Sequence, residues 1–394
     1  MKELQRDFLK YQAKTTPFPL GIEIDHAKGS YVYDTDGKEY LDFVAGVSAC
    51  SLGHCHPNIV AAIKAQSERY LHVMVYGEFA QEPAVNLAKE LAKELPHSLK
   101  VTYLVNSGTE AIEGALKLAK RVTGRGGLIA AHNAYHGSTH GALSLLGAEK
   151  QKKAYRPLLP GIRFIEFNEE KDLEKITTQT AAVLLETIQG GAGFIVPKND
   201  YLKKVKRKCE AVGAMLILDE IQPGFGRTGK LFGFEHFDVV PDILVMGKGM
   251  GGGLPIGAFN SSSKHMKLLS EQPKLGHITT FGGNPVIASA ALATLRTIKS
   301  EHIIEAIAEK EKLFRSLLKH PTIKHINGTG LMLAPFFESE EIANQVVLKS
   351  MEKGLILFWL LWEKKAVRIS PPLNISLEEI RKGCAIINEV LNDL

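Results

Sequence analysis

Seven short apolar runs in the middle of this 394-residue chain constrain its fold more than any other feature. They cover residues 101–105, 127–131, 162–167, 181–186, 214–219, 242–246 and 255–259. Helical patterns separate most of them, and short apolar runs joined by helical crossovers are typical of a buried, mostly parallel sheet. The sequence therefore predicts an α/β fold whose large domain holds a mostly parallel seven-stranded sheet flanked by helices.

The flanking segments predict a second, smaller α/β domain. Residues 31–43 have the pattern of a β-hairpin, because Asp36-Gly37 separates two strand-like runs. Helical periodicity covers residues 58–70, 82–95, 285–299, 301–319 and 376–392, and short strands are expected at 330–336, 355–360 and 366–369. We expect residues 1–52 to join residues 288–394 in the small domain and residues 53–287 to form the large one.

Composition excludes several classes of partner. The net charge of +5 is small, and lysine and arginine alternate with acidic residues, so we expect no nucleic-acid partner. The four cysteines lack the spacing of a disulfide scaffold. Residues 1–8 contain no apolar signal region, and no apolar run is long enough to span a membrane. The expected location is the cytoplasm, without membrane association.

Lys248 is the strongest candidate for a catalytic residue. It follows the apolar run 242–246 and lies among glycines, which let backbone and ligand approach closely. A desolvated lysine there would be a nucleophile, whereas the alternative is a solvated loop residue. The run 214–219 ends in a carboxylate, Asp219. A nucleophilic lysine and a strand-end carboxylate are what a pyridoxal phosphate enzyme needs.

A candidate phosphate site follows the run 101–105. Ser107-Gly108-Thr109 forms a turn between this run and a helical pattern at 111–120, where free backbone N–H groups and a hydroxyl would meet. An ordinary helix N-cap is the alternative. Walker-type spacing is absent, so a nucleoside triphosphate is not implied.

Two other groups of residues invite a functional interpretation that the sequence does not favour. His54-Cys55-His56 lacks further ligands at zinc-site spacing, so we expect no metal. Trp359 and Trp362 flank a strand-like run, and we expect core or dimer contacts for them in place of a role at a cofactor site.

Several motifs together carry a family resemblance. They are Gly53-His54-Cys55-His56-Pro57, Asn106-Ser107-Gly108-Thr109-Glu110, Tyr135-His136-Gly137, Leu218-Asp219-Glu220-Ile221-Gln222, Gly226-Arg227-Thr228-Gly229, Gly247-Lys248-Gly249, Thr279-Thr280-Phe281-Gly282-Gly283-Asn284-Pro285 and Arg368-Ile369-Ser370-Pro371-Pro372. From about Gly29 onward the chain resembles the class III aminotransferases (ornithine/acetylornithine type, or ω-aminotransferases), which are pyridoxal phosphate enzymes of fold type I.

The resemblance implies a role for each matching residue. Lys248 would form the Schiff base with the cofactor and move the substrate's α-proton, and Asp219 would hold the pyridinium nitrogen. Arg368 would bind a substrate carboxylate. Thr280 would reach the cofactor phosphate of the neighbouring subunit, which implies a homodimer with active sites at the interface. The other implied cofactor-binding residues are Ser107, Gly108, Thr109, Tyr135, His136, Glu186 and Gln222.

Two departures from the family pattern bear on the substrate. Ser138 stands where ornithine and acetylornithine enzymes usually carry an arginine, which removes a second carboxylate anchor. Gly191 replaces a glutamate that in the family masks the carboxylate-binding arginine while an ω-amine is bound, so Arg368 would stay available.

The expected activity is a ping-pong transfer of an amino group from an ω-amino acid or amine to a keto acid, with 2-oxoglutarate as the expected acceptor. The sequence leaves the donor open among ornithine, acetylornithine, lysine, diaminobutyrate, 4-aminobutyrate and other amines. Two alternatives also stay open: an aminomutase or racemase on the same scaffold, and a catalytically silent binding protein.

Overall fold

The computed structural model describes residues 2–394 and contains the predicted seven-stranded sheet. Its order is β4-β10-β9-β8-β7-β5-β6, and only β10 runs antiparallel to its neighbours. The strands are β4 (Val101–Val105), β5 (Gly127–Ala131), β6 (Ile162–Ile165), β7 (Thr180–Glu186), β8 (Met215–Asp219), β9 (Ile243–Gly247) and β10 (Gly257–Ser261). Every residue of β7 to β10 is buried, which explains why these strands appear in the sequence as unbroken apolar runs.

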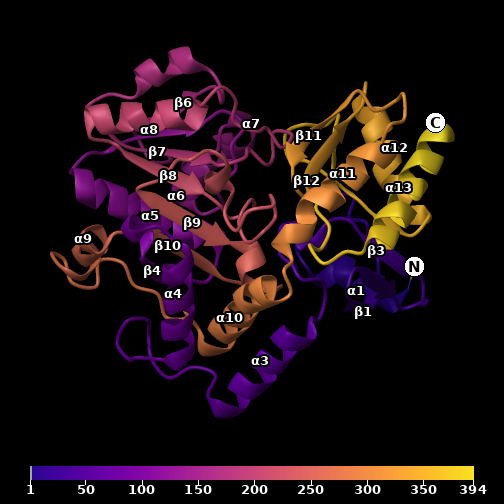
Figure 1. Ribbon diagram of the computed structural model, residues 1–394, viewed down its shortest axis with the longest axis horizontal. Helices are drawn as coiled ribbons and strands as arrows, with labels where there is room; N and C mark the ends of the chain where they lie inside the picture. The colour runs from indigo at the N-terminus through magenta and orange to yellow at the C-terminus, as the bar shows by residue number, and fades with distance from the viewer. Residues whose placement is uncertain (1) are drawn as a thin grey trace.

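Helices pack around this sheet (Figure 1). They are α1 (Glu3–Tyr11), α2 (Ala45–Ser48), α3 (Pro57–Arg69), α4 (Glu82–Glu94), α5 (Gly108–Thr123), α6 (His140–Ser144), α7 (Glu149–Lys152), α8 (Tyr201–Val212), α9 (Ser263–Met266), α10 (Pro285–Ser300), α11 (Ile307–Leu317), α12 (Glu340–Glu352) and α13 (Leu377–Asn392). Helix α5 packs across β4 and β7 to β10, whereas α3 and α4 pack against α10.

The two ends of the chain form a second α/β part, as predicted. Figure 1 shows the indigo N-terminal strands beside the orange and yellow C-terminal helices. A four-stranded sheet joins β1 (Ile24–Lys28), β2 (Tyr31–Asp34) and β3 (Glu39–Asp42) to β13 (Leu355–Ile356). Two strand pairs complete this part: β11 (His325–Thr329) with β12 (Met332–Phe336), and β14 (Phe358–Trp359) with β15 (Val367–Arg368). The domain boundaries after residues 52 and 287 stay a prediction.

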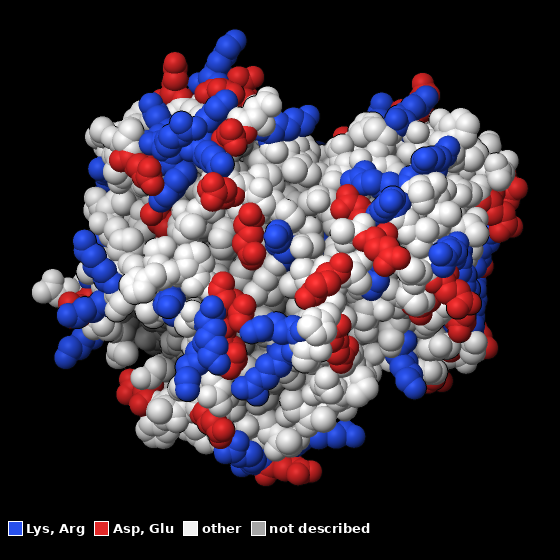
Figure 2. Space-filling model, in the orientation of Figure 1, with Lys and Arg blue, Asp and Glu red and all other residues white. Residues whose placement is uncertain are grey.

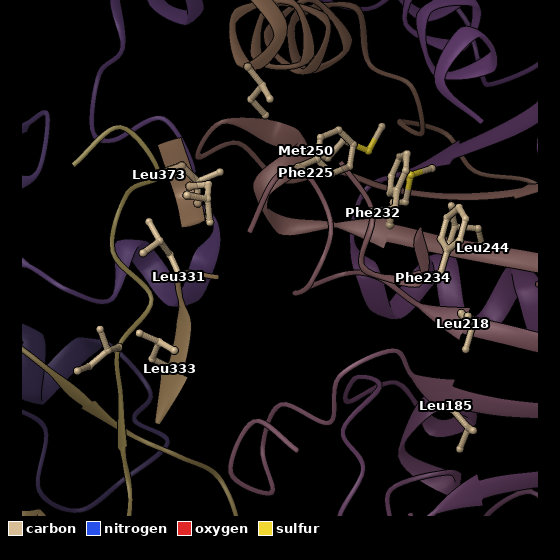
Figure 3. Packing of buried hydrophobic residues seen from close by; sticks show 14 of the residues in the cluster. Leu185, Leu218, Phe225, Phe232, Phe234, Leu244, Met250, Leu331, Leu333 and Leu373 are labelled. Atoms are coloured by element: carbon tan, nitrogen blue, oxygen red, sulfur yellow. The ribbon is translucent and has the colours of Figure 1, made fainter. Parts of the chain in front are cut away.

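One continuous apolar core joins the two parts. Figure 3 shows Leu185, Leu218 and Leu244 on the large sheet and Leu331 and Leu373 on the C-terminal segment. All five side chains belong to the same buried cluster. The core therefore holds the C-terminal segment, which carries Arg368, against the region beyond the carboxyl ends of the large-sheet strands.

Some elements differ from the prediction. The expected strand at 355–360 is two short strands in different sheets, because the chain passes from one sheet to the other at Leu357. Helix α11 begins at Ile307, after a short 3₁₀ turn at Ile304–Ala306. The sequence analysis missed α1, α8 and α12, as well as β1 and β11.

Charged side chains are mixed over the face in Figure 2. The densest basic group lies over α8, where Lys203, Lys204 and Lys206 all form ion pairs with acidic neighbours. None of the helices within residues 2–394 is both long and apolar enough to cross a lipid bilayer.

Candidate active site

A pocket of about 480 Å³ opens at the carboxyl ends of β7, β8 and β9. Ligands collect at this edge in open α/β sheets because the connecting loops and helix N-termini converge there. The last residues of β7 and β8, Glu186 and Asp219, are direct partners across the parallel pair. The pocket is lined by Val47, Gly108, Thr109, Tyr135, His136, Gly137, Ser138, Glu186, Gly191, Asp219, Ile221, Gln222, Pro223, Lys248, Phe358, Trp359, Leu361 and Arg368.

Lys248 follows β9 directly and begins a short 3₁₀ helix, Lys248–Gly251. Its φ of 44° lies in the left-handed region, which costs a non-glycine residue energy and is often found at functional sites. Burial lowers the pKa of its amine, Asp219 opposes this effect and Arg368 adds to it. Within residues 2–394 the amine has no hydrogen-bond partner, so a neutral nucleophilic form is accessible.

Asp219 is held in a fixed orientation. Its Oδ2 lies 2.8 Å from Nδ1 of His136, and its Oδ1 accepts a 2.9 Å hydrogen bond from the backbone N–H of Ile221. Asp219 is 3% exposed and His136 is 2% exposed. A buried carboxylate with two such partners is suited to pair with a cationic ring nitrogen.

Glu186 adds a second buried carboxyl group beside Asp219. It accepts hydrogen bonds from the backbone N–H groups of Gly190 (2.9 Å) and Tyr135 (3.3 Å). Burial raises the pKa of Glu186 to about 7, and His136 partly offsets that rise. Glu186 therefore carries a proton below neutral pH in the cofactor-free protein.

The N-terminus of α5 faces the pocket through Gly108 and Thr109. The hydroxyl of Ser107 accepts from the backbone N–H of Glu110 and so caps the helix. A Cβ on Gly108 would lie 2.7 Å from Ile221, so glycine is needed for this close approach. The first helical N–H groups and the positive end of the helix dipole form an anion site.

Arg368 reaches the pocket from β15. It is 4% exposed, and its Nε and Nη1 are buried without a hydrogen-bond partner in the described part of the chain. Its guanidinium lies 5.2 Å from the ring centroid of Phe194. Burial lowers the pKa of Arg368 to about 10, which leaves it charged at neutral pH. Unpartnered guanidinium nitrogens in a pocket are suited to a carboxylate ligand.

The structure brings together nearly all the residues expected at the site. Those that line the pocket are Gly108, Thr109, Tyr135, His136, Glu186, Asp219, Gln222, Lys248 and Arg368. Ser107 does not line it, because its side chain caps α5. Thr280 lies exposed and away from the pocket of its own chain.

The sequence analysis missed the apolar wall of the pocket. Phe358, Leu361 and Val47 line it, and so does Trp359. Trp359 packs against the main apolar core, as expected, and it lines the pocket as well. No pattern in the sequence marked these residues, because an apolar side chain looks the same whether it fills a core or lines a cavity.

The histidines of His54-Cys55-His56 have separate partners. His54 Nε2 lies 2.8 Å from Asp42, whereas His56 Nε2 lies 3.6 Å from Glu301. The carboxylate of Asp42 and the Cys50 side chain raise the pKa of His54 to about 10. Residues 2–394 contain no group of three or more His, Cys, Asp or Glu side chains that could hold a metal ion.

The pocket residues fit pyridoxal phosphate. The N-terminus of α5 would hold the phosphate, Asp219 the ring nitrogen and Lys248 the aldehyde carbon, whereas the unpartnered nitrogens of Arg368 remain for the substrate. An amine nucleophile, a buried carboxylate and an anion-binding helix end are the donor set that this cofactor requires.

Comparisons with known proteins identify the family of the chain. The family model for class-III aminotransferases matches residues 11–391. Acetylornithine aminotransferase of Caldanaerobacter subterraneus is 39% identical over 95% of both chains. Putrescine aminotransferase of Pectobacterium atrosepticum is 38% identical over 98% of this chain and 86% of the relative. The solved ornithine aminotransferase of Toxoplasma gondii, described with partial occupancy of PLP at its active site, has 32% identity and a TM-score of 0.91 over 99% of this chain and 94% of its own.

Fold and site thus define an α/β enzyme of amino-group chemistry. The chain belongs to the class-III aminotransferases.

Proposed function

We propose that this aminotransferase uses pyridoxal phosphate to move an amino group from an ω-amino acid or amine to an oxo acid by a ping-pong mechanism. The observation that carries the proposal is that the buried amine of Lys248 shares the pocket with the fixed carboxylate of Asp219. The relatives named acetylornithine and putrescine aminotransferase support this class of donor.

Each group in the pocket has a distinct task. When bound, the cofactor supplies an aldehyde that accepts the amino group and a ring that withdraws electrons from the substrate carbon. Asp219, oriented by His136, keeps the ring nitrogen protonated. Lys248 would hold the cofactor's aldehyde carbon and would move the proton at the substrate carbon, a task suited to an amine of lowered pKa. Arg368 binds a substrate carboxylate and fixes its orientation.

Gln222 and Tyr135 complete the proposed cofactor site. Gln222 is proposed to lie near the phenolic oxygen of the cofactor, and its Nε2 is 3.5 Å from Ser48 Oγ. Tyr135 is proposed to stack on the ring. Its hydroxyl lies 3.2 Å from Ser138 Oγ. Both side chains line the pocket and are partly exposed, so a ligand can reach them.

A homodimer is part of the proposal. Leu71, Phe79, Leu275, Ile278 and Phe281 are each more than half exposed. The two segments that carry them are in contact, since the backbone N–H of residue 76 donates to the carbonyl of residue 279 at 3.2 Å. A group of exposed large apolar side chains on neighbouring segments is typical of an interface between copies. Thr280 lies within it, which supports the proposal that Thr280 serves the partner's cofactor. The cytoplasm remains the expected location.

Spectroscopy tests the activity. The purified protein should be yellow and should lose its near-visible absorption with borohydride. Each candidate donor should shift that absorption in a half-reaction, and an oxo acid should restore it. The acceptor expected from the sequence, 2-oxoglutarate, is a prediction that the second half-reaction tests. Steady turnover without any oxo acid would favour an aminomutase or racemase, and a protein that stays colourless with added cofactor would favour a silent binding protein.

A further inference from the structure

We infer that the pocket selects ligands with a single carboxylate and an apolar tail, so that the acceptor is a monocarboxylic oxo acid in preference to a dicarboxylic one. The inference rests on the proposed function for the reaction itself. It goes beyond that function in naming the chemical class of the acceptor and of any amino-acid donor, and it departs from the sequence expectation, which was the dicarboxylic 2-oxoglutarate.

The pocket has one positively charged side chain that can pair with a ligand carboxylate. Lys248 and Arg368 are the only lysine and arginine among its lining residues in the described chain, and Lys248 is assigned to the cofactor. The lysines nearest in sequence to Arg368 do not line the pocket. Lys364 is paired with Glu340, and Lys365 is exposed. A second carboxylate would therefore lack a cationic partner from the same chain.

Position 138 offers only a neutral group. The Ser138 side chain is exposed at the pocket, and its hydroxyl faces the hydroxyl of Tyr135. A hydroxyl pair can donate one hydrogen bond to a ligand but cannot neutralise a carboxylate.

Position 191 is closed by an aromatic side chain. A Cβ on Gly191 would lie 3.0 Å from Nε1 of Trp362 and 3.3 Å from Cβ of Leu361. The backbone N–H of Trp362 also donates to the carbonyl oxygen of Gly191 at 3.0 Å. This packing fixes Trp362 and Leu361 against the glycine, so residue 191 contributes a surface without charge.

The wall beside Arg368 is apolar. Phe358 is the direct partner of Arg368 in the antiparallel pair of β14 with β15, so the two side chains lie on the same face. Phe358 is 40% exposed and Leu361 is 50% exposed, and both line the pocket with Val47. A ligand whose carboxylate binds Arg368 would place its tail along this wall. Apolar carbons gain from leaving water there, whereas a second carboxylate would lose hydration without a partner.

Binding can be measured without the cofactor. The chain has two tryptophans: Trp359 lines the pocket and Trp362 packs against the pocket residue Gly191, so intrinsic fluorescence reports ligand binding. Pentanoate and glutarate match in length and differ by one carboxylate. We expect pentanoate to bind cofactor-free protein about tenfold more tightly than glutarate. Arg368→Ala should abolish the pentanoate signal. Equal or tighter binding of glutarate would overturn the inference, including the case in which a second copy of the chain supplies a cation.

The matched reaction uses the holoenzyme converted to its amine form. The rate constant for recovery of the near-visible absorption should be about tenfold higher for 2-oxopentanoate than for 2-oxoglutarate at subsaturating concentration. Ser138→Arg supplies a second cation and should bring the two rate constants closer together. A preference for 2-oxoglutarate, or an unchanged ratio in Ser138→Arg, would contradict the inference. If no oxo acid restores the absorption, the proposed function is refuted. The fluorescence titration would still test whether the pocket prefers ligands with a single carboxylate.

Discussion

His136 Nδ1 lies 2.8 Å from Asp219 Oδ2, and both side chains are almost fully buried. The contact connects the loop after β5 to the end of β8 and fixes the carboxylate at the base of the pocket. Because the second oxygen of Asp219 is held by the backbone of Ile221, the carboxylate has little freedom to turn away from a bound ring. Orientation and charge can therefore be tested separately.

We expect Asp219→Asn to lower kcat by roughly 100-fold or more, since a neutral amide cannot keep the ring nitrogen protonated. The amide is similar in size, so the protein should fold and bind cofactor. His136→Gln is the matched variant, because it keeps the carboxylate and removes only its imidazole partner. His136→Gln should lower kcat by a smaller factor than Asp219→Asn does. The measurement is single-turnover kinetics with one donor, and equal losses in the two variants would contradict a distinct role for the charge.

Lys248→Ala should abolish multiple turnover and leave cofactor weakly bound. The reason is that no other lysine lines the pocket in the described residues, so nothing replaces the amine that holds the aldehyde and moves the proton. Steady-state assays with the best donor measure the loss. Lys230→Ala, at an exposed lysine, is the control and should retain full turnover. Near-normal turnover of Lys248→Ala would show that the catalytic amine lies elsewhere.

Arg368→Ala should raise the apparent KM for the oxo acid more than about tenfold, because losing a charge-assisted pair costs on the order of 2–4 kcal/mol of binding. The apparent KM for donors with a carboxylate should rise by a similar factor, whereas the KM for simple amines should not change. Arg368→Lys keeps the charge without the bidentate geometry, so its KM for the oxo acid should lie between those of the wild type and Arg368→Ala. If oxo-acid affinity is unchanged in Arg368→Ala, another cation such as Lys364 or Lys365 binds the carboxylate.

The sequence predicts the large sheet well because its buried strands are unbroken apolar runs. Strands β7 to β10 are buried along their whole length, so apolar composition alone marks them, and Asp219 and Lys248 are visible as polar residues at strand ends. Arg368 is different. Its strand has two residues, too few for any periodicity, and only the family resemblance indicated its role.

Other features could not be predicted because they depend on tertiary packing. Phe358 and Trp359 belong to a two-residue strand, and their place beside Arg368 follows from pairing across the sheet. The closure of Gly191 by Trp362 joins residues 171 positions apart, and no local pattern records it. The raised pKa of Glu186 likewise depends on burial beside a second strand end.

The buried carboxyl of Glu186 should make the stability of the cofactor-free protein depend on pH. Its pKa rises from 4.5 to about 7 on folding, so the protonated group stabilises the fold fully below pH 4.5, and this contribution is lost as the pH rises through about 7. Glu186→Gln should therefore raise the free energy of unfolding by on the order of 2 kcal/mol at pH 8 relative to its effect at pH 5. Urea unfolding at the two pH values measures the difference.

A second buried carboxyl group and a control variant help to interpret the pH dependence of stability. Glu220, whose pKa burial also raises to about 7, should leave a residual pH dependence in Glu186→Gln. Glu68→Gln, at an exposed site, should leave the wild-type profile unchanged. A parallel pH profile in Glu186→Gln and wild type would mean that Glu186 is ionised throughout this range.

The last prediction concerns assembly. The apolar surface around Leu275 and Ile278 should be covered by a second copy, so sedimentation of the wild type at micromolar concentration should show a dimer or a tetramer built from two such dimers. Ile278→Glu places a charge in that surface and should produce monomers with little activity. Leu348→Glu, at a 43% exposed leucine on α12, is the matched control and should remain a dimer.

Thr280→Ala should also remain a dimer but release cofactor several-fold more readily, because a phosphate contact from the partner is lost. An active wild-type monomer would contradict both the interface and the role of Thr280, whereas unchanged cofactor affinity in a dimeric Thr280→Ala would contradict only that role.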